Sequence, residues 1–234
     1  MPHHSGFTKR STERSAHRFL LFSLLCTGIL LSSMPARGAP NPTPLKYHQL
    51  AVPILGVTLN QAHQPMGIVT HVVIHFEQRP DHNGLRLRFR IDPGRFSPYA
   101  QHAVTQAIAR ACQAAHLRLD SWTIYLTFPY QGLTMYGDSL SAMVGLSVVA
   151  MAKGDMVIFG RAITGTITED GHIGAVGGIP YKVEAAYAEH MDRIVIPEER
   201  DLRDDEWQTP FMMQVSPVST LDKAYYVLTG HTLQ

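Results

Sequence analysis

The chain has 234 residues, of which 45% are hydrophobic and 17% are charged, and its formal net charge is +1. This length and composition are typical of one globular domain with a sizeable core and a short appendage. Glycine and proline are frequent, but no repeat is present, which excludes collagen-like, low-complexity and solenoid proteins.

The first 39 residues have the pattern of an export signal. Basic residues at 9, 10, 14 and 18 precede an apolar run at 19–31, which is followed by small residues up to Ala39. The run is shorter than the roughly 17 to 25 residues that span a bilayer. We expect residues 1–39 to be a signal peptide, or alternatively a membrane anchor through residues 19–34. Under either interpretation the domain is exported: periplasmic, secreted, or held at the membrane by its N-terminus.

Removal of residues 1–39 would leave 15 basic and 18 acidic residues, a formal charge of −3. This balance argues against nucleic acid as a partner. Cys112 would be the one cysteine left, so no intramolecular disulfide is expected. We expect residues 40–47, which are rich in proline, to form a linker. Residues 48–230 would then form the folded domain, and residues 231–234 a C-terminal tail.

The N-terminal half of the domain reads as strands followed by a helix. Residues 49–59 and 67–78 are rich in β-branched side chains and predict paired strands joined by a polar turn. Residues 85–91 alternate strictly, which predicts a half-buried strand. The three arginines of that strand, Arg86, Arg88 and Arg90, indicate a solvated face or, alternatively, a site for an acidic partner. Ser97 and Pro98 then predict a helix start, with the helix running to about residue 116.

The C-terminal half mixes short strands with helices. The pattern predicts strands at 122–128 and within 157–167, a hairpin turn at Asp170-Gly171, and a strand at 193–197. Helices are expected over residues 142–153, 183–190 and 221–228. This order lacks the regular alternation of a doubly wound sheet, so the expected fold class is α/β or α+β.

Two segments carry candidate catalytic chemistry. Asp138-Ser139-Leu140-Ser141-Ala142 opens a predicted helix, and Gly177-Gly178 precedes Lys182. A serine hydroxyl is a poor nucleophile at neutral pH, and a desolvated lysine can serve as its base. Together with Thr164-Gly165 between them, these segments resemble the proteolytic domain of Lon proteases over about residues 48–230.

The resemblance implies a compact Lon-like fold with mixed sheets and flanking helices, in which Ser141 is the nucleophile and Lys182 the base. It further implies that Thr164 orients the lysine amine and that Gly177 and Gly178 form a tight turn. Backbone amides around Leu140, Ser141 and Ala142 at the helix start are expected to stabilise an oxyanion, and Asp138 belongs to the same turn. Lon-like domains often form six-membered rings, so a homo-oligomer is an expectation from the resemblance alone.

The expected function is an exported, ATP-independent serine endopeptidase that cleaves peptides or unfolded proteins. Lon couples its protease to an ATP-driven module, whereas this chain contains no Gly-x-x-x-x-Gly-Lys-Ser/Thr segment. Two alternatives remain open. Ser141 could be only a helix cap and Lys182 only a surface lysine, and the domain could bind peptides or assemble with a partner without catalysis.

No metal or cofactor is expected. His71 and His75 lie four residues apart in a predicted strand, where their side chains share a face, but neither a His-Glu-x-x-His nor a Cys-x-x-Cys segment occurs. The simpler interpretation of these histidines is polar surface.

Overall fold

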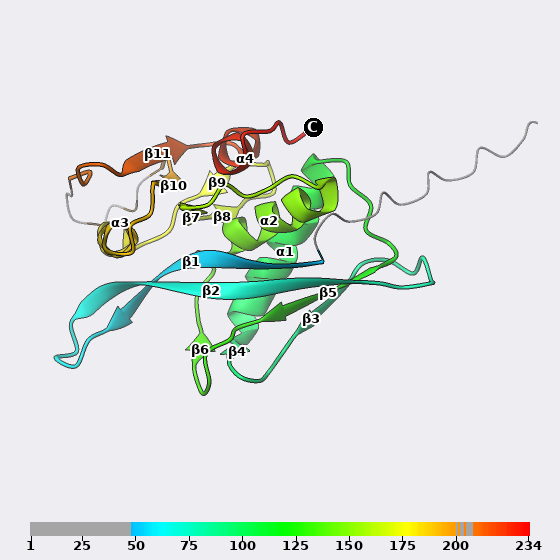
Figure 1. Cartoon of the computed structure of the whole chain (residues 1–234), viewed down its shortest axis with the longest axis horizontal. Coiled ribbons are helices and arrows are strands. Elements are labelled where there is room, and N and C mark those ends of the chain that lie inside the picture. The colour runs from blue at the N-terminus through cyan, green and yellow to red at the C-terminus, as the bar shows by residue number, and fades with distance from the viewer. Residues whose placement is uncertain (1–47, 200, 202–203, 205–207) are drawn as a thin grey trace, which may run out of the picture. The chain divides into compact units, whose positions relative to one another are not determined.

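A twisted four-stranded sheet lies along one side of the domain (Figure 1). The computed structural model describes residues 48–199, 201, 204 and 208–234, so the predicted export segment and linker lie outside the described residues. The strand order is β1-β2-β5-β3, in which β1 and β2 form a long antiparallel hairpin and β3 runs parallel to β5. The bounds are β1 Gln49–Leu59, β2 Pro65–Gln78, β3 Arg86–Phe89 and β5 Trp122–Thr127.

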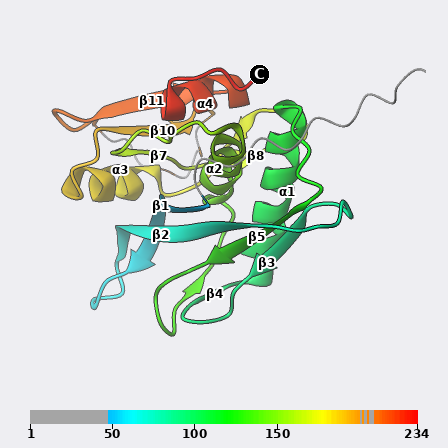
Figure 2. The same ribbon diagram turned by 45° about the vertical axis from the view of Figure 1, so that its right-hand side comes forward.

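Two packed helices cover this sheet. Helix α1 spans Pro98–Ala114, and the Ser97 hydroxyl caps it by accepting a hydrogen bond from the backbone N of Ala100 at 3.1 Å. Helix α2 spans Ser141–Lys153 and lies between α1 and the smaller sheets (Figure 2). All α2 residues from Ser141 to Met151 are buried, as expected of a helix that is apolar around its whole circumference. The centre of the domain is therefore α2.

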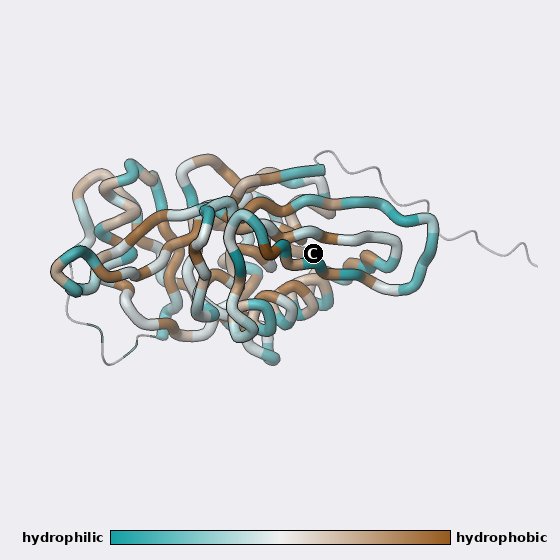
Figure 3. The backbone as a smooth tube through the Cα atoms, turned by 90° about the horizontal axis from the view of Figure 1, so that it is seen from below, coloured by the Kyte–Doolittle hydropathy of each residue, from teal (hydrophilic) through white to brown (hydrophobic). Residues whose placement is uncertain are grey.

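The remaining elements form a second layer. A parallel sheet has the order β11-β10-β7, with helices α3 and α4 beside it. Two further sheets have two strands each, β4-β6 and β8-β9. The bounds are β4 Arg95–Phe96, β6 Thr134–Met135, β7 Arg161–Ile163, β8 Thr166–Ile167, β9 Ile173–Gly174, α3 Ile179–Ala188, β10 Arg193–Pro197, β11 Gln214–Val218 and α4 Leu221–Thr229. Hydrophobic residues follow the central strands and helices, whereas the outer turns are hydrophilic (Figure 3).

The β1–β2 hairpin contacts two hydrophobic clusters with its two faces. Val52 and Ile54 belong to the main cluster around α1 and α2. Leu55, on the opposite face of the same strand, belongs to a second cluster with Ile179 and Val183 of α3. One strand thus separates the α2 side of the domain from the α3 side, which is why residues from both sides meet beside it.

The α+β class is confirmed, and most predicted elements are present, with shifted ends. The predicted helix at 183–190 begins earlier, at Ile179, so that Lys182 lies in its first turn. Strand β11 was not predicted, because its proline weakens a strand pattern. In the predicted arginine strand, Arg86 pairs with Asp81 and Arg90 lies over the Tyr125 ring, both at the sheet surface.

The predicted tail at 231–234 packs on the domain. Leu233 is buried in the main cluster, and the Lys153 amine donates to the carbonyl oxygens of Thr232 and Leu233 at 2.7 and 2.8 Å. Cys112 is buried in α1, and this burial raises the pKa of its thiol to about 12. None of the helices in the described part of the chain has the length and hydropathy of a membrane span.

Candidate active site

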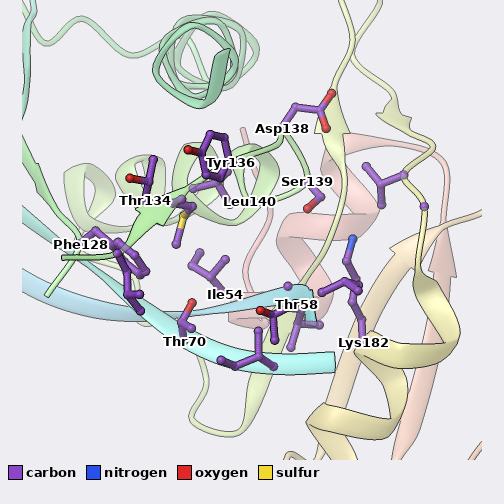
Figure 4. A pocket seen from close by; sticks show the side chains of 18 residues that line it. Ile54, Thr58, Thr70, Phe128, Thr134, Tyr136, Asp138, Ser139, Leu140 and Lys182 are labelled. Atoms are coloured by element: carbon purple, nitrogen blue, oxygen red, sulfur yellow. The ribbon is translucent and has the colours of Figure 1, made fainter. Parts of the chain in front are cut away.

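A cavity of about 570 Å³ opens between the β1–β2 hairpin, the β6 loop and the start of α3. The strands supply its floor, with Ile54, Thr58 and Thr70 among the lining residues, and Tyr136 lies on the opposite wall (Figure 4). Most of the lining is apolar. The charged side chains among the lining residues are Asp138 and Lys182.

The serine turn, residues 137–142, joins β6 to α2 along one wall of the cavity. Gly137 has a φ of +85°, a conformation that glycine adopts without steric cost and that lets the chain reverse before the helix. The backbone of the turn is tied to the segment after β7. The Ser139 carbonyl accepts from Gly165 N at 2.9 Å, and Ala142 N donates to the Gly165 carbonyl at 3.1 Å. These two bonds fix the serine turn against the core.

The two serines of the turn differ in their position relative to the cavity. Ser139 lines it, and its hydroxyl points into the space that the Lys182 amine enters from the other side (Figure 4). Ser141, the predicted nucleophile, is the first residue of α2, is 1% exposed and does not belong to the lining. It does not cap the helix either, because Leu140 occupies the cap position without a side-chain hydrogen bond. Ser139 thus lines the cavity that Lys182 also lines, and Ser141 lies two residues further along, at the start of α2.

Lys182 is unusually buried for a lysine. It lies in the first turn of α3, its side chain lines the cavity, and the residue is 3% exposed. Burial lowers its pKa from 10.5 to about 8, because an ammonium ion loses hydration in an apolar environment. The carboxylates of Asp204 and Asp138 act in the opposite direction but only partly offset the effect of burial. A substantial fraction of the amine is therefore neutral near pH 8.

The start of α3 is held by a distant carboxylate. The two oxygens of Asp204 accept hydrogen bonds from Gly178 N at 2.7 Å and Ile179 N at 3.0 Å, which satisfies two free donors of the helix start. Gly178 has a φ of +72°, and a Cβ there would lie 2.7 Å from a Val57 methyl carbon. Gly177 precedes it and lines the cavity. The glycine pair therefore forms the turn that places Lys182 against the hairpin.

Thr164 is fully buried beside the serine turn. Its hydroxyl donates to the Ser139 carbonyl at 3.4 Å, and its backbone N donates to Val195 in β10. The predicted task of this threonine was to orient the Lys182 amine. Among the described residues, the Thr164 hydroxyl instead forms its hydrogen bond with the backbone carbonyl of Ser139 in the serine turn.

The backbone amides of the turn are not equally available. Ser141 N donates to the Asp138 carbonyl at 2.9 Å, and Ala142 N donates to Gly165, so both are engaged within the fold. For Leu140 N, no acceptor is recorded among the described residues. Leu140 N is thus the predicted oxyanion donor that this structure leaves available.

Tyr99 and Asp204 belong to the site although no sequence motif indicated them. The Tyr99 hydroxyl donates to an Asp138 carboxyl oxygen at 2.8 Å, which raises the pKa of the tyrosine. Tyr99 lies at the start of α1, and Asp204 comes from the segment after β10, so both reach the site only through the tertiary fold.

The two histidines considered as metal ligands lie elsewhere. The His71 ring nitrogen is 3.3 Å from the Tyr130 hydroxyl, and His75 stacks on Tyr125. Over residues 48–199, 201, 204 and 208–234, no cluster of three or more histidine, cysteine or acidic side chains is placed to hold a metal ion.

The similar proteins found by comparison with known proteins are Lon proteases. The archaeal Lon protease of Methanocaldococcus jannaschii is 30% identical over 105 residues, which are 45% of this chain and 16% of that protein. The archaeal Lon protease of Archaeoglobus fulgidus is 27% identical over 138 residues, 57% of this chain and 22% of that protein. The peroxisomal Lon protease homolog 2 of Danio rerio is 35% identical over 88 residues, 37% and 10% of the two chains.

The aligned segments thus span less than a quarter of the length of each of these relatives. The model of the Lon protease (S16) C-terminal proteolytic domain matches residues 96–228, more than half of the chain, and includes both the serine turn and Lys182. On the strength of this match, the chain belongs to the Lon protease (S16) proteolytic-domain family.

Proposed function

We propose that this domain is a serine endopeptidase in which Ser139 is the nucleophile and Lys182 the general base. One observation carries the proposal: Ser139 and Lys182 line the same cavity, and burial of the lysine brings its pKa to about 8. The resemblance to Lon first indicated Ser141, two residues along the same turn. Ser139 is proposed because its side chain lines the cavity that Lys182 also lines, and Ser141 remains the alternative nucleophile that the experiments below distinguish.

In the proposed reaction, the neutral Lys182 amine accepts the Ser139 proton while the serine oxygen bonds to the peptide carbonyl carbon. The carbonyl π electrons move to oxygen, and Leu140 N at the start of α2 donates a hydrogen bond to the oxyanion. When the tetrahedral intermediate collapses, the C–N bond breaks and the Lys182 ammonium returns the proton to the leaving amine. Water then hydrolyses the acyl-enzyme, with Lys182 again acting as the base.

The cavity indicates which substrates can enter. Its apolar floor and walls accommodate an extended peptide, whereas a folded protein would have to unfold first. Because the sequence contains no Gly-x-x-x-x-Gly-Lys-Ser/Thr segment, we propose that cleavage of peptides and unfolded segments proceeds without ATP. Addition of ATP and Mg²⁺ should therefore leave the rate of peptide cleavage by the purified protein unchanged.

Export of the domain is proposed from the N-terminal residues, which are basic and then apolar. Cell fractionation with N-terminal sequencing tests it. A mature N-terminus near residue 40 in the exported fraction supports a cleaved signal, and an intact N-terminus in the membrane fraction supports an anchor. Recovery of the intact chain from the cytosol would contradict both. Ring formation stays a prediction from the family.

The nucleophile can be identified chemically. Treatment with a fluorophosphonate followed by peptide mass spectrometry should place the adduct on Ser139, because the reagent captures the activated hydroxyl. Ser139→Ala and Lys182→Ala should each reduce cleavage of unfolded casein by at least about 10³-fold, and the double variant should be no worse, since the two residues act as a unit. Ser141→Ala should retain most activity.

An adduct on Ser141, with loss of activity in Ser141→Ala but not in Ser139→Ala, would transfer the assignment to Ser141. Absence of both an adduct and cleavage in the folded wild-type protein would favour a domain that binds peptides without catalysis. Activity should rise with pH through an apparent pKa of about 8, because Lys182 must be neutral to accept the proton.

A further inference from the structure

The β1–β2 hairpin lacks charged side chains over an unusual length. Between Lys46 and Glu77 there is no aspartate, glutamate, lysine or arginine, although 17% of the whole chain is charged. The distal end of the hairpin projects from the rest of the domain in both ribbon views (Figures 1 and 2). Exposed strands with apolar side chains and no charges are prone to pair with other chains, and proteins often protect them with charged side chains such as lysine. The exposed hairpin therefore has the character of a binding surface.

The strand register assigns the exposed side chains to two faces. Thr58 pairs with Met66 and Gly56 with Ile68, so these four residues share one face, called here the hairpin face. Leu59, which pairs with Pro65, lies on the opposite face. On the hairpin face, Met66 is 44% exposed and Ile68 is 38% exposed.

The opposite face is already occupied along most of the distal hairpin. A Cβ at Gly67 would lie 1.8 Å from the Tyr181 carbonyl oxygen, and a Val57 methyl lies against Gly178. This face therefore packs on α3. Among the described residues, the hairpin face has no comparable cover, so it is the face on which a ligand can lie.

The hairpin face is continuous with the candidate active site. Gly56, Thr58 and Ile68 line the cavity that also contains Ser139 and Lys182. Met66 lies one step further along the same face, toward the hairpin tip. The path from Thr70 in the cavity to Met66 is four residues, or about 13 Å along the strand, which corresponds to about four residues of an extended peptide.

We propose that the hairpin face binds an extended, uncharged and apolar stretch of the substrate polypeptide, about four residues from the bond that is cleaved. This inference rests on the proposed peptidase function. Continuity with the cavity favours a substrate over other occupants, because a chain that extends from Ser139 along the floor toward the hairpin tip lies on Ile68 and then on Met66. The missing charges favour apolar sequences, since residues 47–76 offer no aspartate, glutamate, lysine or arginine for an ion pair with the ligand.

Met66→Lys tests the proposal, and Leu59→Lys is its matched control. Both substitutions place one lysine on an exposed apolar position near the same hairpin tip, but on opposite faces. Each is made in the Ser139→Ala protein, and binding is measured by fluorescence anisotropy. The probes are a labelled uncharged apolar peptide of about twelve residues and its central part of about four residues.

Met66→Lys should weaken binding of the long peptide by about tenfold, as expected for loss of one buried methionine contact. Leu59→Lys should change it by less than about twofold, and binding of the short peptide should be the same in all three proteins. Equal effects of the two lysines on the long peptide, or no effect of either, would overturn the proposal. Preference for a charged long peptide of the same length would also overturn it.

Binding is measured without cleavage, so the two proposals can fail separately. Tight, Met66-dependent binding by a protein whose wild type cleaves nothing would leave the hairpin proposal standing and remove the peptidase. If Met66→Lys changed the cleavage of neither long nor short substrates, the peptidase proposal would stand and the hairpin proposal would be wrong. If sedimentation velocity showed self-association that Met66→Lys abolishes while peptide binding stays unchanged, the face would join copies of the chain, and the substrate proposal would be wrong.

Discussion

The two sides of the candidate site are held in place by different forces. The serine turn is fixed by backbone hydrogen bonds to Gly165 and by the buried Thr164 hydroxyl, all within the main core. The lysine side depends on a left-handed glycine, on a carboxylate from a distant segment and on burial of a cationic side chain. The first arrangement sets the position of Ser139, whereas the second sets the protonation of Lys182.

This difference has consequences for mutation. Backbone hydrogen bonds are hard to remove by substitution, so changes of side chain in the serine turn should have little effect on its conformation and on the free energy of unfolding. Lys182, in contrast, is held by steric contact and charge, which single substitutions alter directly. The lysine side should therefore show the larger and more varied responses.

The largest effect is expected from Gly178→Val, compared with Gly137→Val in the serine turn. Both glycines have a positive φ, which a β-branched residue adopts only with strain. At Gly178 the new Cβ would also lie 2.7 Å from a Val57 methyl, whereas nothing lies within 4 Å of a Cβ at Gly137. Urea denaturation should give losses in the free energy of unfolding of about 3 to 4 kcal/mol at Gly178 and about 1 to 2 kcal/mol at Gly137. Equal losses of stability in the two variants would show that the Val57 side chain can move aside without an energetic cost.

The sequence was sufficient for the elements with strong local signals. The β1–β2 hairpin and the α1 start follow from β-branched runs and from the Ser97-Pro98 pair, and the structure contains both. Short strands such as β4, with two residues, carry no periodic signal because tertiary contacts alone define them. Strand β11 escaped prediction for a related reason, since its pairing partner β10 overrides the cost of a proline.

The candidate site was predictable in its segments but not in its geometry. The serine turn and Lys182 were both located, and the structure brings them to one cavity. How each serine lies relative to the cavity depends on the tertiary hydrogen bonds of the turn to Gly165, which no local pattern specifies. Tyr99 and Asp204 were not predicted because each meets the site across a long sequence separation, and neither carries a local motif.

A smaller effect, of opposite sign, is expected from Lys182→Met. A pKa lowered from 10.5 to about 8 means that burying the ammonium costs up to about 3 kcal/mol below pH 8, so the uncharged methionine should raise the free energy of unfolding by about 2 to 3 kcal/mol at pH 7. Between pH 8 and 10.5 the unfolded wild-type protein binds more protons than the folded one. The free energy of unfolding of the wild type therefore rises with pH over this range, and the difference in stability between the wild type and Lys182→Met becomes smaller.

Lys153→Met is the control for that experiment. The Lys153 amine donates to two backbone carbonyls at the C-terminus, so its removal should lower the free energy of unfolding by about 1 kcal/mol. Stabilisation by both substitutions would point to a general effect of methionine, and destabilisation by Lys182→Met would show that its amine is better solvated than its burial indicates.

A small loss of stability, with a clear electrostatic signature, is expected from neutralising the two carboxylates that act on Lys182. Asp204→Asn and Asp138→Asn each remove a negative charge that favours the ammonium form, so each should lower the pKa of Lys182. Asparagine has only one acceptor oxygen for the two backbone N–H groups of Gly178 and Ile179, so Asp204→Asn should also cost about 1 kcal/mol of stability. The pKa can be followed by NMR of ¹³C-labelled lysine, which does not depend on catalysis, and the pH–rate profile should move to lower pH by the same amount. Asp222→Asn on the exposed side of α4 should move neither. A shift to higher pH in Asp204→Asn would mean that loss of its bonds to Gly178 and Ile179 opens the start of α3 to water, and the base would then be tuned by the position of the helix rather than by the charge beside it.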